Sequence, residues 1–456
     1  MNCYFKFKQK SLFSCLQIIK KRGIQNLVAI VTIGGGLGFY KLTRLTFLGD
    51  TGNVAQIKQL LLKIIVTFIL SLGIFTFLSK RKDRVLKLYT LVGGIVGAFF
   101  IGEIYFRIFN PQVFKNEQEQ LFQYHSVYGW DFIPKGSANV VSLGEYKNPI
   151  KLNIYGLRDK EFNLVKTRGT KRIAVLGDSV VASLQVPQED VFTERLESNL
   201  KNTEVINFGI PGFGPTQEYL QLQNEVFSYS PDLVVIVLST GTDFDDLLGT
   251  YDWNFGYQRP RALVENGNRL KITNIPVPLP HQELRKRYTY LPASHLFQFI
   301  SNRLYEKYSL LNLHITYETR FFAKHPSDEV QQSYKLLEII LRVMKEECEK
   351  NGVKLIAVIA PTLVQVYDHI YWPLISKQYQ LDENLYNSLE PNQVMTNILK
   401  SLVIPYLDIT SGLKEKALIG ESLYFYKDRH FNIRGQEVTS ELLLPFVNSH
   451  LLNVMN

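Results

Sequence analysis

The sequence contains little cysteine: Cys3, Cys15 and Cys348 are the three cysteines among 456 residues. The first two precede a long apolar region, so the polar remainder of the chain holds Cys348 alone and cannot form an internal disulfide. This excludes the small disulfide-built folds that many secreted proteins use. The length is sufficient for two or three domains with large hydrophobic cores.

Motifs that bind nucleic acid or nucleotides are also missing. The chain has 51 Lys and Arg against 42 Asp and Glu, a net charge of +9, yet it contains no zinc-finger spacing and no arginine-rich arm. The glycine run at 34–38 follows no strand and precedes no Gly-Lys-Ser/Thr, so it is not interpreted as a phosphate-binding loop. We therefore expect no nucleic-acid partner.

The excess positive charge instead lies beside apolar sequence. It forms two clusters, namely Lys6, Lys8, Lys10, Lys20, Lys21 and Arg22, and Lys80, Arg81, Lys82, Arg84 and Lys87. Positive charge at the ends of apolar segments is typical of membrane proteins. The basic composition is thus explained by membrane topology.

Three apolar segments lie before residue 107, at about Asn26–Tyr40, Leu60–Leu78 and Leu88–Phe106. A helix that crosses a bilayer needs roughly 20 apolar residues, and the second and third segments approach that length. The first segment is short, and Lys41 and Arg44 follow it closely. The sequence therefore predicts two to three transmembrane helices.

The two basic clusters also predict an orientation. Both should face the cytoplasm, and the third segment then carries residue 107 and all that follows to the outside. This holds whether or not the first segment crosses the membrane. We expect a multi-pass membrane protein with its large C-terminal part outside the cytoplasm, which is the periplasmic face if the membrane is a bacterial inner membrane.

Strands and helices alternate after residue 170. Short apolar runs rich in β-branched residues predict strands at Arg172–Leu176, Val205–Phe208, Leu233–Leu238, Lys354–Ile359 and Ile404–Ile409. Helical patterns cover Asp190–Leu200, Thr216–Ser228, Gln331–Lys350 and Gln436–Leu452. This pattern is typical of an α/β fold, a doubly wound five-stranded parallel sheet with helices on both faces. Functional sites of such sheets form beyond the C-terminal ends of the strands.

The predicted domains are a membrane region at 1–106, a connecting β-rich region at 107–170 and the α/β domain at 171–456. An insertion at about 245–330 separates the third and fourth strands. It contains a hairpin at Glu265–Asn268, a proline-rich stretch at Ile275–Pro280 and an aromatic helix near Leu296–Tyr308. The insertion either shapes access to the site or offers a surface to a partner.

Residues able to carry chemistry follow the predicted strands. Gly177-Asp178-Ser179 follows the first strand, and a serine at a strand-to-helix turn is exposed at the sheet edge, although it can also serve only as a helix cap. A glycine-rich turn at 207–214 follows the second strand and can direct a backbone N–H toward a ligand. Gly241-Thr242-Asp243 follows the third, and Asp428 and His430 lie near the C-terminus, either as a proton-transfer pair or as a polar turn.

In this order and at these places, the four blocks resemble the SGNH/GDSL hydrolase family over about residues 170–452. The turn Asn153–Arg158, of the form Asn-x-x-Gly-x-Arg, is similar to that of membrane-anchored bacterial members. The resemblance implies a flavodoxin-like sheet in which Ser179 is the nucleophile, His430 the base and Asp428 the orienting acid. It also implies an oxyanion hole made by the backbone N–H groups of Ser179 and Gly212 together with the residue at 242.

Two positions depart from the family pattern. The third block of the family usually reads Gly-Asn-Asp, and its Asn completes the oxyanion hole, whereas this chain has Thr242 with a shorter hydroxyl. Loss of one such donor costs roughly 10²–10³ in turnover. Asp428 and His430 are two residues apart, where many members have three, so Asp408 at the end of the fifth strand is an alternative orienting acid.

The sequence therefore predicts a membrane-anchored serine esterase or O-acyltransferase acting on acyl, chiefly acetyl, esters of an envelope or exported polysaccharide. Four aromatic residues of the insertion can stack on sugar rings or simply fill a core, namely Trp253, Phe255, Tyr257 and Tyr288. The expected partners are the acylated carbohydrate, the membrane and other polysaccharide-assembly membrane proteins. No metal or organic cofactor is expected.

Two other functions stay open at this stage. The first is a catalytically silent module of the same fold that binds glycan or scaffolds a polysaccharide export system, which Thr242 favours and the pair Ser179 and His430 opposes. The second is a flavodoxin-like cofactor binder, which is disfavoured because the first loop lacks phosphate-binding residues.

Overall fold

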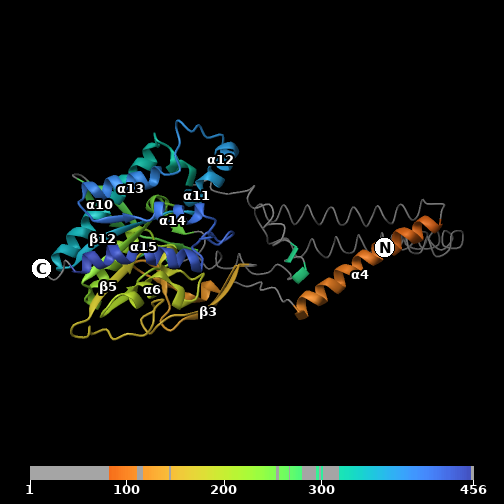
Figure 1. Cartoon of the computed structure of the whole chain (residues 1–456), viewed down its shortest axis with the longest axis horizontal. Helices are drawn as coiled ribbons and strands as arrows, with labels where there is room; N and C mark the ends of the chain where they lie inside the picture. Colours follow the sequence, from red (N-terminus) through yellow and green to blue (C-terminus); the bar gives the residue numbers. More distant parts are fainter. Residues whose placement is uncertain are drawn as a thin grey trace, which may run out of the picture. The chain divides into compact units, whose positions relative to one another are not determined.

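The structure is a computed structural model that describes residues 82–109, 117–142, 145–252, 256–265, 268–279, 294–296, 299–300 and 318–452 (Figure 1). The chain divides into two compact units, Met1–Phe109 and Asn110–Asn456, and each is described by itself. The second unit includes both the β-rich region that precedes residue 171 and the α/β domain that follows it.

In the first unit the structure describes one helix, α4 (Lys82–Phe109). Its 28 residues extend roughly 40 Å, and large apolar side chains such as Leu91 and Phe100 are exposed along it. By length and composition, Asp83–Phe109 can cross a membrane. This helix contains the third predicted span, whereas the first two predicted spans lie outside the described residues.

A five-stranded parallel sheet forms the centre of the second unit. Its strands are β5 (Lys171–Leu176), β6 (Thr203–Asn207), β7 (Leu233–Ser239), β12 (Lys354–Ala360) and β13 (Tyr406–Asp408). They lie in the order β13-β12-β7-β5-β6 with every neighbouring pair parallel. Counted along the chain this is 2-1-3-4-5, the flavodoxin-like order. The predicted fold class and all five predicted strands are confirmed.

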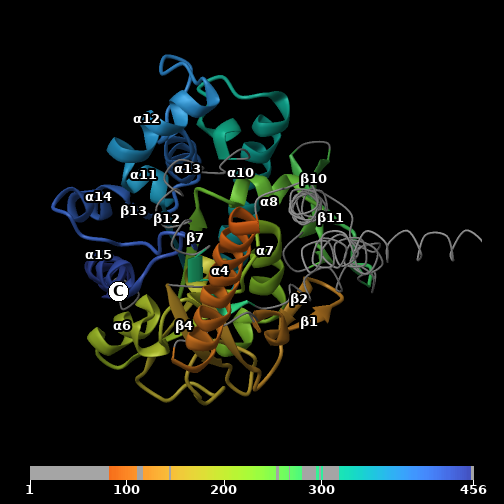
Figure 2. The same ribbon diagram turned by 90° about the vertical axis from the view of Figure 1, so that its right-hand side faces the viewer.

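Helices cover both faces of this sheet. The main ones are α6 (Phe192–Asn199), α7 (Pro215–Asn224), α10 (Asp328–Lys350), α13 (Glu390–Ser401), α14 (Thr410–Leu418) and α15 (Ile433–Leu452). Figure 2 shows α6, α14 and α15 on one side of β7 and β12, and α7 and α10 on the other. The predicted helix at Thr216–Ser228 is α7 followed by the short 3-10 helix η3 (Val226–Tyr229).

Each strand divides its side chains between two cores. In β7, Val234 and Ile236 join the cluster under α7 and α10, while Val235 and Val237 join the cluster under α6 and α15. Successive side chains of a strand point to opposite faces, so a strand that is apolar at every position is buried on both. This explains the continuous apolar runs in the sequence.

Two hairpins precede the sheet and share a third core with its edge. They are β1 (Phe122–His125) with β2 (Gly129–Phe132), and β3 (Ser137–Ser142) with β4 (Tyr146–Lys151). Their buried residues, such as Trp130 and Val140, pack against Ile210 and Phe213 from the loop after β6. The region predicted as a connection therefore packs on the loops at the C-terminal edge of the sheet.

The insertion after β7 begins with α8 (Asp243–Leu248) and two short strands, β8 (Tyr251–Asp252) and β9 (Tyr257–Gln258). The predicted hairpin around 265–268 is confirmed, because β10 (Arg261–Glu265) pairs antiparallel with β11 (Arg269–Thr273). Most of the aromatic helix predicted near 296–308 lies outside the described residues.

Candidate active site

Ser179 lies at the turn between β5 and the short helix α5 (Ser179–Ala182). The carboxylate of Asp178 caps this turn, because its Oδ1 accepts the N–H of Val180 at 2.8 Å. A side chain at position 177 would clash with Val181, so the turn requires Gly177. The hydroxyl of Ser179 is thereby held at the C-terminal edge of the sheet, and its residue is partly exposed.

Asp428 and His430 lie in a tight loop that leads into α15. The N–H of Phe425 donates to the carbonyl of His430 at 2.8 Å, and the N–H of Arg429 donates to the carbonyl of Phe425 at 2.9 Å. Arg429 adopts the left-handed conformation, with φ of 68°. This turn of the backbone places the side chains on either side of it close together, which explains how a spacing of two residues serves here.

The structure brings the three predicted catalytic side chains into one chain of hydrogen bonds. Ser179 Oγ lies 2.7 Å from His430 Nε2, and His430 Nδ1 lies 2.6 Å from Asp428 Oδ1. The side chain of His430 is 29% exposed and that of Asp428 is 20% exposed. These distances are those of a nucleophile, a base and an orienting acid.

His430 and Asp428 also shift each other's pKa. Burial disfavours the charged form of His430, but the charge and hydrogen bond of Asp428, with Asp178 adding to them, raise its pKa overall. Burial alone would likewise raise the pKa of Asp428, but the charge and hydrogen bond of His430 and the hydroxyl of Tyr146 lower it overall. Asp428 therefore stays ionised, and His430 is a stronger base than a free imidazole.

Gly212 lies in the loop after β6, with φ of 79°. The loop is fixed by two bonds, from the N–H of Ile210 to the carbonyl of Gly177 at 3.1 Å and from the indole of Trp130 to the carbonyl of Pro211 at 3.0 Å. Within the described parts of the chain, no hydrogen bond uses the backbone N–H of Ser179 or of Gly212. Both groups are thus available as donors, and their oxyanion role stays a prediction.

Thr242 lies in the loop after β7, and its hydroxyl donates to Asp178 Oδ2 at 3.1 Å. A hydroxyl has a single hydrogen to donate, so this contact competes with an oxyanion. The oxyanion role of Thr242 stays a prediction. The side chain ties the loop after β7 to the turn that carries Ser179.

Asp408, the alternative orienting acid, is occupied elsewhere. Its Oδ1 accepts the N–H of Thr410 at 2.9 Å at the start of α14, and its Oδ2 accepts the amide of Asn392 at 3.1 Å. Asp428 is thus the carboxylate that contacts His430.

Two further residues, Tyr146 and Glu145, contact Asp428 and belong to no recognisable sequence motif. Tyr146, the first residue of β4, donates its hydroxyl to Asp428 Oδ2 at 2.6 Å. Glu145 accepts the backbone N–H groups of Lys427 and Asp428 at 2.6 and 3.0 Å. Both lie some 280 residues before Asp428, in the region predicted only as a connection. Their contacts with Asp428 could therefore not be predicted from the sequence.

Buried acidic groups lie behind the nucleophile turn. Glu218 of α7 is fully buried, and within the described residues neither of its carboxyl oxygens has a hydrogen-bond partner. Burial, followed by the charges of Asp178 and Asp246, raises its pKa well above the ordinary value. Burial and the charge of Glu218 also raise the pKa of Asp243. Among the described residues, no group of three or more His, Cys, Asp or Glu side chains could hold a metal ion.

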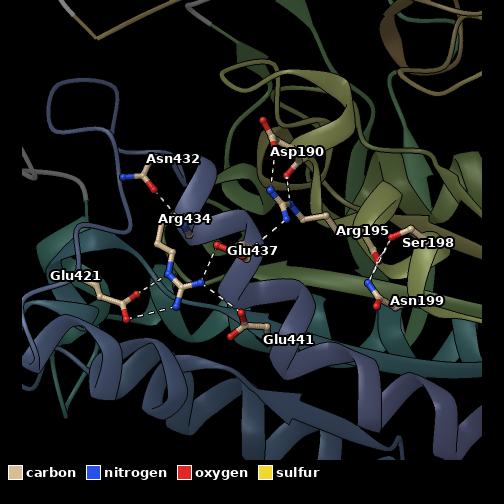
Figure 3. A network of polar contacts seen from close by, with 10 residues as sticks. Asp190, Arg195, Ser198, Asn199, Glu421, Asn432, Arg434, Glu437 and Glu441 are labelled. Carbon is tan, nitrogen blue, oxygen red and sulfur yellow. Dashed lines mark hydrogen bonds and ion pairs between the residues drawn. The ribbon is translucent and has the colours of Figure 1, made fainter.

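An ion-pair network holds the start of α15, directly after His430 (Figure 3). Arg434 contacts Glu421, Glu437 and Glu441 at 2.6, 2.7 and 3.3 Å. Arg195 of α6 contacts Asp190 at 2.6 Å and reaches toward Glu437. The network joins α15 to α6 and to the loop before the triad residues.

No protein-family model matches the sequence, and no curated protein matches it. Solved structures similar to the chain include a member of the lipolytic protein G-D-S-L family from Veillonella parvula, the acetyl xylan esterase AlAXEase and a variant of an acetyl xylan esterase from Geobacillus stearothermophilus. They are 14%, 13% and 13% identical to this chain, and the matches cover 60%, 60% and 62% of it and 97%, 99% and 96% of their own lengths. The TM-scores are 0.32, 0.34 and 0.32. Identities and TM-scores this low carry no argument about this chain. The fold is therefore assigned from the strand order, and the site from the distances between its residues.

Proposed function

We propose that the chain is a serine esterase or O-acyltransferase of the SGNH/GDSL type, anchored in a membrane and acting on acyl esters of an envelope or exported polysaccharide. The observation that carries the proposal is the continuous chain from Ser179 Oγ through His430 to Asp428, with both bonds at 2.7 Å or less. Such an arrangement activates a hydroxyl for attack on an acyl carbonyl.

The reaction follows from this geometry. The Ser179 oxygen attacks the acyl carbonyl while His430 Nε2 takes the hydroxyl proton, and the resulting oxyanion is stabilised by the N–H groups of Ser179 and Gly212. Collapse of the adduct breaks the ester bond, and His430 returns the proton to the departing alcohol. Water or a sugar hydroxyl then attacks the acyl-enzyme by the same steps, giving hydrolysis or acyl transfer.

The substrate class and location rest on the first unit of the chain. Helix α4 is long and apolar enough to cross a membrane, and the basic residues at its start favour a cytoplasmic position for that end. The second unit would then lie outside the cytoplasm, and the substrates proposed for it there are acylated polysaccharides. Polysaccharide-assembly membrane proteins remain the proposed partners.

One of the aromatic residues considered for sugar stacking is excluded from that role. Tyr257 is 3% exposed and stacks on Trp130, with ring centroids 6.1 Å apart, so it belongs to the hairpin core. Trp253, Phe255 and Tyr288 lie outside the described residues.

The alternative proposal is a catalytically silent module that binds glycan or scaffolds an export complex. The bond from Thr242 to Asp178 favours it, because the side chain that would complete the oxyanion hole is engaged elsewhere. Loss of one such donor lowers turnover by roughly 10²–10³, which leaves a measurable enzyme if the rest of the site works.

Replacement of the nucleophile tests the enzymatic proposal. We expect the detergent-solubilised full chain to hydrolyse a p-nitrophenyl acetate ester and to be labelled by a fluorophosphonate, and S179A to lose both, because the attacking oxygen is removed. S183A is a matched control, since Ser183 directly follows α5 and bonds to Gln436 rather than to the triad. Wild-type protein that resists labelling at high probe concentration would support the silent module, and S179A with full turnover would contradict the nucleophile assignment.

A further inference from the structure

We propose that the β3–β4 hairpin is part of the catalytic machinery, with Tyr146 and Glu145 as positioning residues for Asp428, and through it for His430. The inference rests on the proposed function and extends the site beyond its three predicted members. It follows from what the hairpin contacts at its turn end and at its middle.

Tyr146 fixes the free oxygen of the orienting carboxylate. His430 takes Asp428 Oδ1, and the Tyr146 hydroxyl takes Oδ2 at 2.6 Å. Burial, followed by the charge and hydrogen bond of Asp428, raises the pKa of Tyr146, so its hydroxyl keeps its proton and acts as the donor. A carboxylate held at both oxygens cannot rotate, and it keeps the imidazole in the orientation that presents Nε2 to Ser179.

The ring of Tyr146 is itself held in place. It packs against Phe425, with ring centroids 4.7 Å apart, and Phe425 exchanges backbone bonds with the loop of Asp428 and His430. The tyrosine therefore contacts both the orienting carboxylate and the loop that carries it.

Glu145 fixes the backbone on which Asp428 stands. Its two oxygens accept the N–H groups of Lys427 and Asp428, and one also accepts the hydroxyl of Ser142 at 2.9 Å from the same hairpin. Hydrogen bonds that backbone N–H groups donate to a carboxylate are among the stronger ones in proteins. They hold the chain directly before the left-handed residue Arg429.

The middle of the hairpin contacts the nucleophile side of the site. The side-chain amide of Asn148, which is buried, donates to the carbonyl of Leu184 at 2.9 Å and to the carbonyl of Val186. These residues follow α5 and thus the turn of Ser179. One hairpin therefore bridges two elements whose reacting atoms must stay within 2.7 Å, although Ser179 and His430 are 251 residues apart in sequence.

The test uses Y146F, E145Q and a matched control in the full chain solubilised in detergent. The control is Y124F, which also removes a tyrosine hydroxyl bond, from Tyr124 to the carbonyl of Val277, but does not contact the triad. Two readouts are measured: kcat and KM for p-nitrophenyl acetate against pH, and the NMR titration of the His430 imidazole with labelled histidine, assigned through H430N.

We expect Y146F to lower kcat about 10- to 100-fold, the loss typical of one hydrogen bond to a charged group, with KM within about twofold of wild type. The acid limb of the pH profile and the His430 titration should both move to higher pH, because a carboxylate that lost a donor binds the imidazolium more strongly. E145Q should lower kcat about tenfold, and Y124F should behave as wild type.

Wild-type kcat in Y146F, or a lower kcat with an unmoved His430 titration, would overturn the inference, since the second result indicates packing alone. If Y146F does not fold, E145Q decides, and wild-type kcat in that variant counts against the proposal. A wild-type chain without esterase activity would refute the proposed function instead, while the His430 titration would still decide the role of the hairpin.

Discussion

At the scale of single residues, the structure explains how Asp428 and His430 act together at a spacing shorter than that of many family members. Asp428 and His430 are two residues apart, and Arg429 between them adopts a φ of 68°. Non-glycine residues take this conformation at a cost, and they persist in it where the surrounding structure enforces it. Here the bonds within the 425–430 loop enforce it, so the short spacing is compatible with a triad.

The residue that orients His430 can be identified by D428N. The amide would hold the imidazole in the wrong tautomer, and turnover should fall by up to about 10⁴-fold. The acid limb of the kcat/KM profile should move to lower pH, because Asp428 raises the pKa of His430 in the wild type. The measurement is ester hydrolysis between pH 5 and 9.

D408N is the matched control for that change. Asp408 accepts the N–H of Thr410 at the start of α14 and the amide of Asn392, whereas Asp428 bonds to His430, so D408N should lower stability with little effect on the pH profile. A pH profile that moves in D408N and not in D428N would show that Asp408, and not Asp428, orients His430.

At the scale of elements, α7 and α8 carry buried acids to the back of the nucleophile turn. Glu218 and Asp243 are at most 1% exposed, and burial raises the pKa of each. Such groups are stable in the interior only while protonated. The arrangement makes this part of the fold sensitive to rising pH.

The corresponding prediction concerns E218Q. The native state holds the Glu218 proton more tightly than the unfolded chain, so the contribution of Glu218 to the free energy of unfolding is fully present below the unfolded pKa near 4.5 and is lost as pH rises through the folded pKa. The slope reaches at most about 1.4 kcal/mol per pH unit for one group. Glutamine mimics the neutral acid, and E218Q should remove this contribution.

Urea unfolding of the wild type and E218Q between pH 4 and 8 is the measurement. The variant should match the wild type near pH 4 and become the more stable of the two as pH rises. Parallel stability curves over the whole range would show that Glu218 titrates normally in the folded protein.

At the scale of the whole molecule, a helix able to cross a membrane precedes in sequence the second unit, which has its own cores. The second unit begins before the predicted α/β domain, because the two hairpins pack onto the loops around Gly212 and Ser179. A catalytic fragment that starts at residue 171 would lack Tyr146, Glu145 and the third core.

Membrane anchoring predicts how the full chain fractionates. We expect it to remain in the membrane pellet after an alkaline carbonate wash and to be released by detergent. Protease added to intact spheroplasts should digest the catalytic unit, since it is proposed to lie outside. Release by carbonate would argue against a spanning helix, and protection from protease until lysis would reverse the orientation.

The sequence by itself determined the parts that local pattern encodes. Continuous apolar runs marked strands buried on both faces, and residues directly after those strands had to meet at one edge of a parallel sheet. Strand pattern placed Ser179 at that edge, whereas Asp428 and His430 were predicted as its partners only through the resemblance of the four sequence blocks to the SGNH/GDSL hydrolases. The tertiary structure decided what depends on pairing between distant segments. The hydroxyl of Thr242 donates to Asp178, and Tyr146 of the β3–β4 hairpin donates to Asp428. The partner of a side chain depends on which elements pack beside it, and the hydrophobic periodicity of a sequence does not contain that information.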